Sequence, residues 1–222
     1  MTERETPSVD GLVIGILGGT GDQGRGLARR FALAGHHVII GSRSSERAAA
    51  AAQEIGHGVQ GLANADAARG ASVIIAAVPW EGHGDLLSAL AGELAGKIVV
   101  DCVNPLGFDQ RGAYALPVAE GSAAQQAAAL LPGSRVVAAF HHVSAVLLLD
   151  PEVDTIDLDV LVLGDDREAT DLVQALAARI PGVRGIYAGR LRNCGQIEAL
   201  TANLVSINRR YKAHAGLRVT DI

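Results

Sequence analysis

The sequence is poor in the residues from which several common kinds of site are built. It has only two cysteines, Cys102 and Cys194, among 222 residues, so we expect neither a disulfide framework nor a metal cluster. The hydrophobic stretches have the length of strands and are broken by Gly, Pro or charged residues, so none is expected to cross a bilayer. The acidic, polar N-terminus does not resemble a signal peptide. We therefore expect a cytoplasmic protein that makes no membrane contact.

Convincing general acids and bases are also scarce. A dehydrogenase that acts on a hydroxy acid, an amino acid or a sugar acid needs such a group beside the hydride acceptor. The two lysines are poor candidates, because Lys97 begins a predicted strand at the edge away from ligands and Lys212 lies among other cations. This lack favours a reaction in which two redox cofactors exchange a hydride directly. The protein would then only align two rings and exclude water.

The charge of the chain argues against one class of partner. A net charge of −5 at pH 7 disfavours nucleic-acid binding as the main task. The charge is unevenly distributed, however, because the segment from Arg184 to Arg218 has seven basic residues and a single acidic residue, Glu198. This basic segment is either a solvated helix face or a surface for a polyanionic small molecule.

The strongest signal in the chain is a glycine-rich segment between a predicted strand and a predicted helix. Residues 12–17 form an apolar run of strand length, and residues 27–32 carry apolar side chains at helical spacing. Between them, Gly19, Gly21 and Gly24 fill a G-x-G-x-x-G pattern. Such a turn lets backbone amides and a helix N-terminus hold a pyrophosphate. The sequence therefore predicts a dinucleotide site.

The end of the second predicted strand indicates which dinucleotide binds. An NAD site usually has Asp or Glu there to hold the ribose 2′-hydroxyl, whereas this chain has Ser42 and Arg43. A carboxylate would repel a 2′-phosphate, while a hydroxyl and a guanidinium would bind it. Arg47 lies one helical turn beyond Arg43 and would reach the same phosphate. These residues predict that the site binds NADP.

Strands and helices alternate along most of the chain. This alternation predicts an α/β fold, a Rossmann-type doubly wound parallel sheet with a small C-terminal α/β domain. A longer irregular loop is expected over residues 104–121, at the edge where such sheets bind ligands. We expect a disordered tail over residues 1–10, an NADP-binding Rossmann domain over residues 11–144 and a small C-terminal domain over residues 145–222.

Two further features lie at predicted strand ends. His141 and His142 follow a strand on the ligand side, where one is expected to face the core and satisfy a backbone group while the other could line the pocket. With no Cys or carboxylate at ligand spacing nearby, they do not predict a metal site. Trp80 comes directly after Pro79 and is either a hydrophobic plug or a contact for a flat cofactor ring.

Four motifs occur in an order and at spacings that resemble a known family. They are Gly18 to Gly26 (GGTGDQGRG), Gly41-Ser42-Arg43, Val78-Pro79-Trp80 and Gly164-Asp165-Asp166. Together they strongly resemble the NADPH-dependent reductases of the deazaflavin coenzyme F420, over a region from about Leu12 to the C-terminus. The resemblance implies reversible hydride transfer between NADPH and the deazaflavin, in a cleft between a Rossmann domain and a small C-terminal domain. It also implies a homodimer.

The resemblance implies a set of contacts as well. Within the turn formed by Gly19 and Gly24, the pyrophosphate would meet Thr20, Gly21, Asp22 and Gln23, and the 2′-phosphate would meet Ser42, Arg43 and Arg47. Pro79 and Trp80 would lie near the nicotinamide. The hydride-transfer site would have no catalytic side chain and would be bordered by His141, Val143 and Ala145. The family often has Lys at the position of Arg47 and Pro at that of Ser144.

The basic segment also gains an interpretation from the resemblance. The deazaflavin carries a phosphodiester and a glutamate tail, so a local cationic surface would favour its binding. We expect some of the side chains in this segment to form that surface; the candidates are Arg190, Arg192, Arg209, Arg210 and Lys212.

Two other functions remain open. A small NADPH-dependent imine or ketone reductase would be similar in its first half, but such enzymes usually have a long helical second domain with a placed acid or base. Here only about 75 residues follow Ser144. A non-catalytic NADPH-binding module would bind NADPH with normal affinity and turn over no acceptor.

Overall fold

The computed structural model describes residues 6–222, and its centre is a single eight-stranded sheet. The strand order is β10-β9-β8-β5-β4-β1-β2-β3. The strands are β1 (Val13–Leu17), β2 (His37–Ser42), β3 (Gln60–Ala63), β4 (Val73–Ala76), β5 (Ile98–Asp101), β8 (Arg135–Ala138), β9 (Leu158–Gly164) and β10 (Val183–Gly189). A separate hairpin joins β6 (Leu106–Asp109) to β7 (Gly112–Ala115). The predicted Rossmann-type α/β fold is confirmed.

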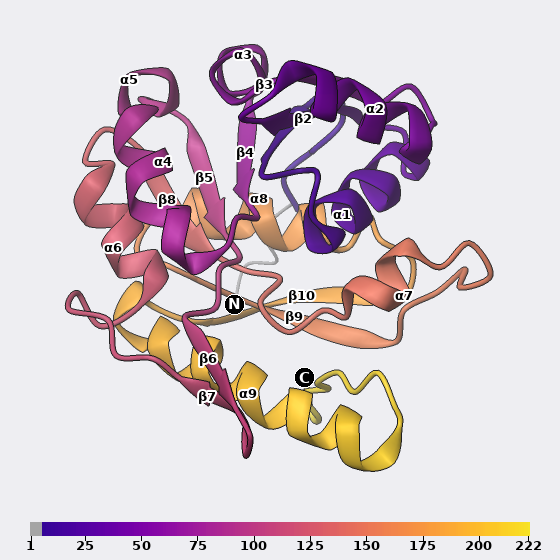
Figure 1. Ribbon diagram of the computed structural model, residues 1–222, viewed down its shortest axis with the longest axis vertical. Helices are drawn as coiled ribbons and strands as arrows, with labels where there is room; N and C mark the ends of the chain where they lie inside the picture. The colour runs from indigo at the N-terminus through magenta and orange to yellow at the C-terminus, as the bar shows by residue number, and fades with distance from the viewer. Residues whose placement is uncertain (1–5) are drawn as a thin grey trace.

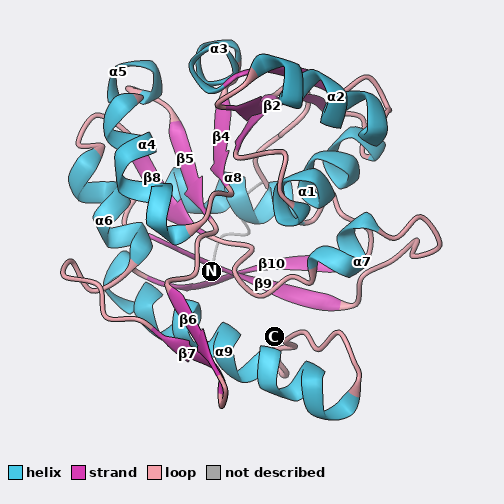
Figure 2. Ribbon diagram, in the orientation of Figure 1, coloured by secondary structure: helices cyan, strands magenta, loops and turns pink. Residues whose placement is uncertain are grey.

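Helices cover both faces of the sheet (Figures 1 and 2). They are α1 (Asp22–Leu33), α2 (Ser45–Ile55), α3 (Asn64–Gly70), α4 (His83–Ala89), α5 (Ala91–Leu94), α6 (Ala123–Leu130), α7 (Ala145–Leu149), α8 (Arg167–Ala177) and α9 (Cys194–Tyr211), with 3-10 turns η1 (Trp80–Gly82) and η2 (Leu191–Asn193). One core cluster packs α1, α2 and α8 on the sheet, and a second packs α3, α4 and α6 on its other face. None of these helices is both long and apolar enough to span a membrane.

The order in which successive strands are added to the sheet reverses between β1 and β4. From β1 the strands continue to β2 and β3 on one side, and from β4 they continue to β5 and β8 on the other, all of them parallel. The carboxyl ends of these strands therefore meet at one edge. In a doubly wound sheet, ligands bind at this edge, at the point where the strand order reverses.

Strand β9 runs antiparallel to the strands from β8 to β3 and projects beyond them. It is antiparallel to β8 and pairs with it only through Leu163 and Gly164, so the earlier part of β9 extends past the carboxyl end of β8. The strand β10 lies parallel to β9 along most of its length. Figure 1 shows this pair crossing below the ends of β4 and β5, with α9 and the hairpin beyond it. The ligand edge therefore faces a second layer of the same chain.

The structure differs from the sequence predictions in local details. Part of the segment expected to be irregular forms the β6–β7 hairpin. The predicted tail over residues 1–10 is wrong at its end, because Val9 is only 4% exposed and lies in the core. Residues 1–5 lie outside the described residues. The boundary after residue 144 stays a prediction, since β9 and β10 continue the sheet of the first part.

One buried arginine connects α1 to the segment that follows α7. Arg30 is 3% exposed, and its guanidinium donates hydrogen bonds to the carbonyl oxygens of Leu147, Leu148, Asp150 and Val153 at 2.5–3.1 Å. These carbonyls belong to the C-terminal end of α7 and the loop beyond it, where backbone acceptors lack helical partners. The planar guanidinium satisfies several of them at once, as a single ammonium group would not.

We predict that Arg30→Met lowers the free energy of unfolding by about 3 kcal/mol, because several buried carbonyl groups lose their donors. Urea denaturation measures the change. The control is Arg29→Met, at the preceding position of α1, which is only partly buried. Equal denaturation midpoints for the two variants would contradict this role for Arg30.

Candidate functional site

The glycine turn between β1 and α1 brings backbone segments closer together than side chains would permit. A Cβ atom at Gly24 would lie 2.7 Å from the Cα of Gly19, and one at Gly19 would lie 2.5 Å from the Cβ of Ile40. Gly18 has a φ of 72°, in the left-handed region that favours glycine. A Cβ at Gly21 would meet nothing closer than 3.7 Å, so the outer face of the turn is open.

This open face lies at the N-terminus of α1. The cap residue Gly21 offers no side-chain acceptor, so the first N–H groups of the helix are free to bind an anion. The helix is 12 residues long, and its dipole adds positive potential at the same place. The residues present therefore fit a pyrophosphate, as the G-x-G-x-x-G pattern predicts.

The carboxyl end of β2 lies beside the glycine turn. Gly41 pairs with Leu17 across β1 and β2, and the Gly41 carbonyl accepts a hydrogen bond from the Gly19 amide at 3.1 Å. Ser42 follows directly and is buried, while Arg43 and Arg47 are exposed. The three residues predicted to hold a 2′-phosphate are thus gathered at the ligand edge.

The start of α2 orders these residues. The Ser44 hydroxyl caps α2 by accepting a hydrogen bond from the Arg47 amide at 3.2 Å, and it donates one to Glu46 at 2.7 Å. The Ser42 hydroxyl accepts a hydrogen bond from the Ser44 amide at 3.4 Å. These bonds hold Arg47 in the first turn of α2, one helical turn from Arg43.

The segment after β4 forms the next wall of the site. Leu17 pairs with Ala76, so this segment leaves the sheet next to the glycine turn. A Cβ at Gly18 would lie 2.5 Å from a Val78 side-chain carbon. Pro79 is exposed and Trp80 is half-buried. Both residues predicted near the nicotinamide therefore lie beside the predicted pyrophosphate site.

The turn after β8 is held by hydrogen bonds from three directions. Phe140 is fully buried and has a φ of 64°, an uncommon backbone conformation for a large side chain. Its carbonyl accepts a hydrogen bond from the Gln23 side chain of α1 at 3.2 Å. The next carbonyl, of His141, accepts bonds from Asn104 at 2.8 Å and from Thr201 of α9 at 3.2 Å.

This arrangement changes the interpretation of Gln23 and adds two residues that sequence reasoning missed. Because its side-chain amide is bonded to Phe140, Gln23 is available to a pyrophosphate through its backbone N–H. Asn104 and Thr201 are 97 residues apart, yet both hold the turn that carries the histidines. No local pattern in the sequence indicates such a pairing.

The two histidines of this turn have different environments. His142 accepts a hydrogen bond from the Leu161 amide of β9 at 3.4 Å, so it is the member that satisfies a backbone group. His141 is 3% exposed, and neither of its ring nitrogens has a partner among the described residues. Burial lowers the pKa of each to about 4, so both are neutral at pH 7. His141 thus has one donor and one acceptor unused.

The residues after the histidines begin α7. Val143 is 5% exposed and belongs to the core, whereas Ala145 is half-buried at the first position of the helix. The helix packs closely against α1, because a Cβ at Gly26 would lie 2.6 Å from the Leu148 Cβ. The predicted hydride-transfer residues therefore lie beside the helix that begins at the pyrophosphate site.

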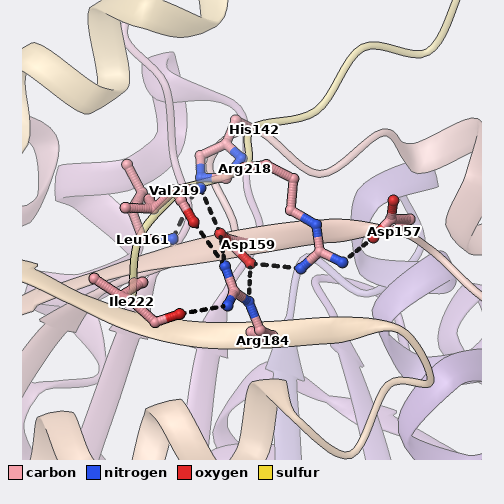
Figure 3. Close-up of polar contacts among 8 residues, drawn as sticks. All are labelled: His142, Asp157, Asp159, Leu161, Arg184, Arg218, Val219 and Ile222. Atoms are coloured by element: carbon pink, nitrogen blue, oxygen red, sulfur yellow. Dashed lines mark hydrogen bonds and ion pairs between the residues drawn. The ribbon is translucent and has the colours of Figure 1, made fainter.

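Two of the basic residues of the C-terminal segment have a structural role (Figure 3). Arg184 contacts both oxygens of the buried Asp159 carboxylate at 2.7 Å, and Arg218 donates to it at 2.9 Å. The Val219 amide also donates to Asp159, which fixes the end of the chain against β9. The Arg184 hydrogen bond contributes most to a pKa of Asp159 well below its usual range.

The remaining basic residues lie on or near α9. Arg190 and Arg192 are exposed just before the helix. Arg209 and Arg210 line a groove of about 650 Å³ between the helix and the tip of the β6–β7 hairpin, and Arg111 joins them from the hairpin. The structure thus divides the basic segment into two arginines bonded to Asp159 and a group of cations on or near α9.

Comparison with known proteins agrees with the fold and shows the family. Residues 13–105 match a family model described as NADP oxidoreductase coenzyme F420-dependent. The F420-dependent NADP reductase of Methanothermobacter marburgensis is 41% identical, over 95% of this chain and 99% of that protein. A crystal structure from Arthrobacter sp. FB24, provisionally described as an F420-dependent NADP reductase, has a TM-score of 0.83 and 29% identity over 95% of this chain and all of that one.

A more distant likeness concerns the fold alone. The pyrroline-5-carboxylate reductase of Coxiella burnetii has a TM-score of 0.64 with 14% identity, over 91% of this chain and 68% of that one. The fold, the glycine turn and the basic end of β2 define a dinucleotide-binding oxidoreductase of the Rossmann class. Within that class, the chain belongs to the family of F420-dependent NADP reductases.

Proposed function

We propose that this protein transfers a hydride reversibly between NADPH and the deazaflavin coenzyme F420. The main observation behind the proposal is that the glycine turn lies beside Ser42, Arg43 and Arg47 at one edge of the sheet. The chain is also similar to F420-dependent NADP reductases over 95% of its length.

Each part of the dinucleotide has residues suited to it. The N–H groups at the start of α1 receive the pyrophosphate, with Thr20 and Gly21 at the open face of the turn. Ser42, Arg43 and Arg47 receive the 2′-phosphate through a hydroxyl and two guanidinium groups. Pro79 and Trp80 border the nicotinamide.

The proposed reaction depends on alignment of the two rings rather than on proton transfer by a side chain. When bound, the reduced nicotinamide supplies a hydride to the facing ring of the deazaflavin. The turn after β8 and the first residue of α7 keep the two rings in contact, and the layer formed by β9, β10 and α9 limits the access of water. His141 is buried within this turn, and its lowered pKa, about 4, keeps it uncharged.

The exposed basic residues are proposed to favour the anionic tail of the deazaflavin. This role falls to Arg190, Arg192, Arg209, Arg210 and Lys212, since Arg184 and Arg218 are bonded to Asp159. We also propose a cytoplasmic homodimer. Exposed aromatic side chains on the hairpin and on α9 support a contact between two copies; they are Phe108, Tyr114 and Tyr211.

We predict that Arg43→Ala raises the KM for NADPH about tenfold or more, because a hydrogen bond between charged groups contributes roughly 1.5–3 kcal/mol. The KM for NADH should change far less, since NADH has no 2′-phosphate. Steady-state kinetics with both dinucleotides measures the difference. Arg167→Ala, at an exposed position on α8, is the control and should leave both values unchanged. An equal loss for the two dinucleotides would contradict the role of Arg43.

The proposed function itself is tested with purified protein, NADPH and oxidised F420. We expect the absorbance bands of NADPH and of oxidised F420 to fall together, one mole of each per mole of hydride. Binding of NADPH without loss of either band would indicate a non-catalytic module. Turnover of a cyclic imine but not of F420 would favour an imine reductase.

A further inference from the structure

A histidine and an aspartate form a fully buried pair close to the ligand edge. His83 begins α4, directly after the turn that holds Trp80, and Asp101 is the last residue of β5. The His83 Nε2 and the Asp101 Oδ2 are 2.5 Å apart, and both side chains are 0% exposed. The other Asp101 oxygen accepts a hydrogen bond from the Val103 amide at 3.0 Å. Neither residue belongs to the set proposed to contact NADPH.

The hydrogen-bond partners of His83 indicate that its ring carries two protons. Its Nδ1 faces the Gln126 Oε1 at 3.1 Å. The amide nitrogen of Gln126 faces the Glu120 carboxylate at 3.4 Å, which orients the amide so that its oxygen points to His83. Both ring nitrogens of His83 therefore face acceptors, which is the pattern of an imidazolium ion. Burial opposes that charge and is the largest single effect, but Asp101, with Gln126 and Glu198, raises the pKa of His83.

The other titratable groups around this pair leave the charge on His83 in place. Glu198 of α9 accepts hydrogen bonds from the Ala123 and Ala124 amides at the start of α6, and burial raises its pKa to about 7. The nearby His141 is neutral, and burial keeps the Cys102 and Cys194 thiols protonated. Asp101 and Glu198 are thus the acidic groups that act on His83 within the described residues.

The buried pair contacts the site through Trp80. The rings of Trp80 and His83 have centroids 5.6 Å apart and planes inclined at 32°, which places the imidazolium beside the indole face. A cation within about 6 Å of an indole centroid is attracted by the ring quadrupole. Trp80 also begins the 3-10 turn that runs into α4, so the backbone ties the two residues together.

We propose that His83 is a positioning residue, whose imidazolium is held by Asp101 and Gln126 and fixes the Trp80 indole beside the proposed nicotinamide site. The inference rests on the proposed function for the identity of the ligand, but the coupling between His83 and Trp80 is a property of the protein alone. Trp80 is the one tryptophan in the sequence, so its fluorescence reports on this contact without interference.

The first test is a pH titration of tryptophan fluorescence on the cofactor-free wild-type protein between pH 5.5 and 9. Because a protonated imidazole quenches a neighbouring indole, we expect emission to rise in one step as the pH passes the raised pKa of His83. His83→Gln should lose the step, while His37→Gln, at an exposed position, should keep it. Wild-type emission equal to that of His83→Gln at the acid end of the titration, or a step that persists in His83→Gln, would overturn the proposal.

A second variant keeps the test decisive if His83→Gln does not fold. Asp101→Asn removes the negative charge but keeps an oxygen for the Val103 amide, so the emission step should move to lower pH. An unmoved step would overturn the assignment of the charge to this pair. Glu198→Gln should move the midpoint less, because Glu198 acts on His83 only at longer range.

Kinetics then tests whether the coupling matters at the site. His83→Gln should raise the KM for NADPH by about threefold to tenfold with a smaller change in kcat, in line with the loss of one cation–π contact. The wild-type KM should rise over the same pH range as the fluorescence. A fluorescence step with no change in the KM for NADPH would overturn the positioning role. Failure of hydride transfer to F420 would instead refute the proposed function and leave the fluorescence result standing.

Discussion

The close backbone approach at the glycine turn is the constraint on which the rest of the structure depends. Gly19 contacts Ile40 of β2 and Gly24 contacts Gly19 at distances that exclude a Cβ atom. This contact allows α1 to start directly over the carboxyl edge, with its free N–H groups facing the same space as the end of β2. A side chain at either position would push α1 away from the sheet. It would also separate the phosphate-binding groups from Arg43.

Further contacts connect α1 to the turn after β8 and to the chain after α7. Gln23 in the first turn of α1 holds the Phe140 carbonyl, and Arg30 near the end of the same helix holds the chain after α7. One rigid helix thereby positions both the pyrophosphate site and the turn that carries His141. The antiparallel strand β9 extends past β8 and adds the second layer that covers the edge.

Much of the fold and part of the site could be predicted from the sequence, because the signals are local. The glycine spacing, the apolar strand runs and the Ser42-Arg43 pair lie within short segments, and the structure places them together. The rest depends on contacts between distant residues. Asn104 and Thr201 meet on one carbonyl, and His83 pairs with Asp101, only because the folded sheet brings them together. Likewise, only the folded structure shows that Arg184 and Arg218, out of the basic segment, are bonded to Asp159.

The most direct test of direct ring-to-ring transfer uses NADPH with deuterium at the transferred position of nicotinamide C4, mixed with oxidised F420 in ordinary water. Mass spectrometry of the reduced deazaflavin measures the outcome. We predict that every reduced deazaflavin carries one deuterium from NADPH, because the aligned rings exchange the hydride without contact with solvent. Reduced deazaflavin that carries hydrogen from water, with the deuterium lost to the solvent, would contradict direct transfer.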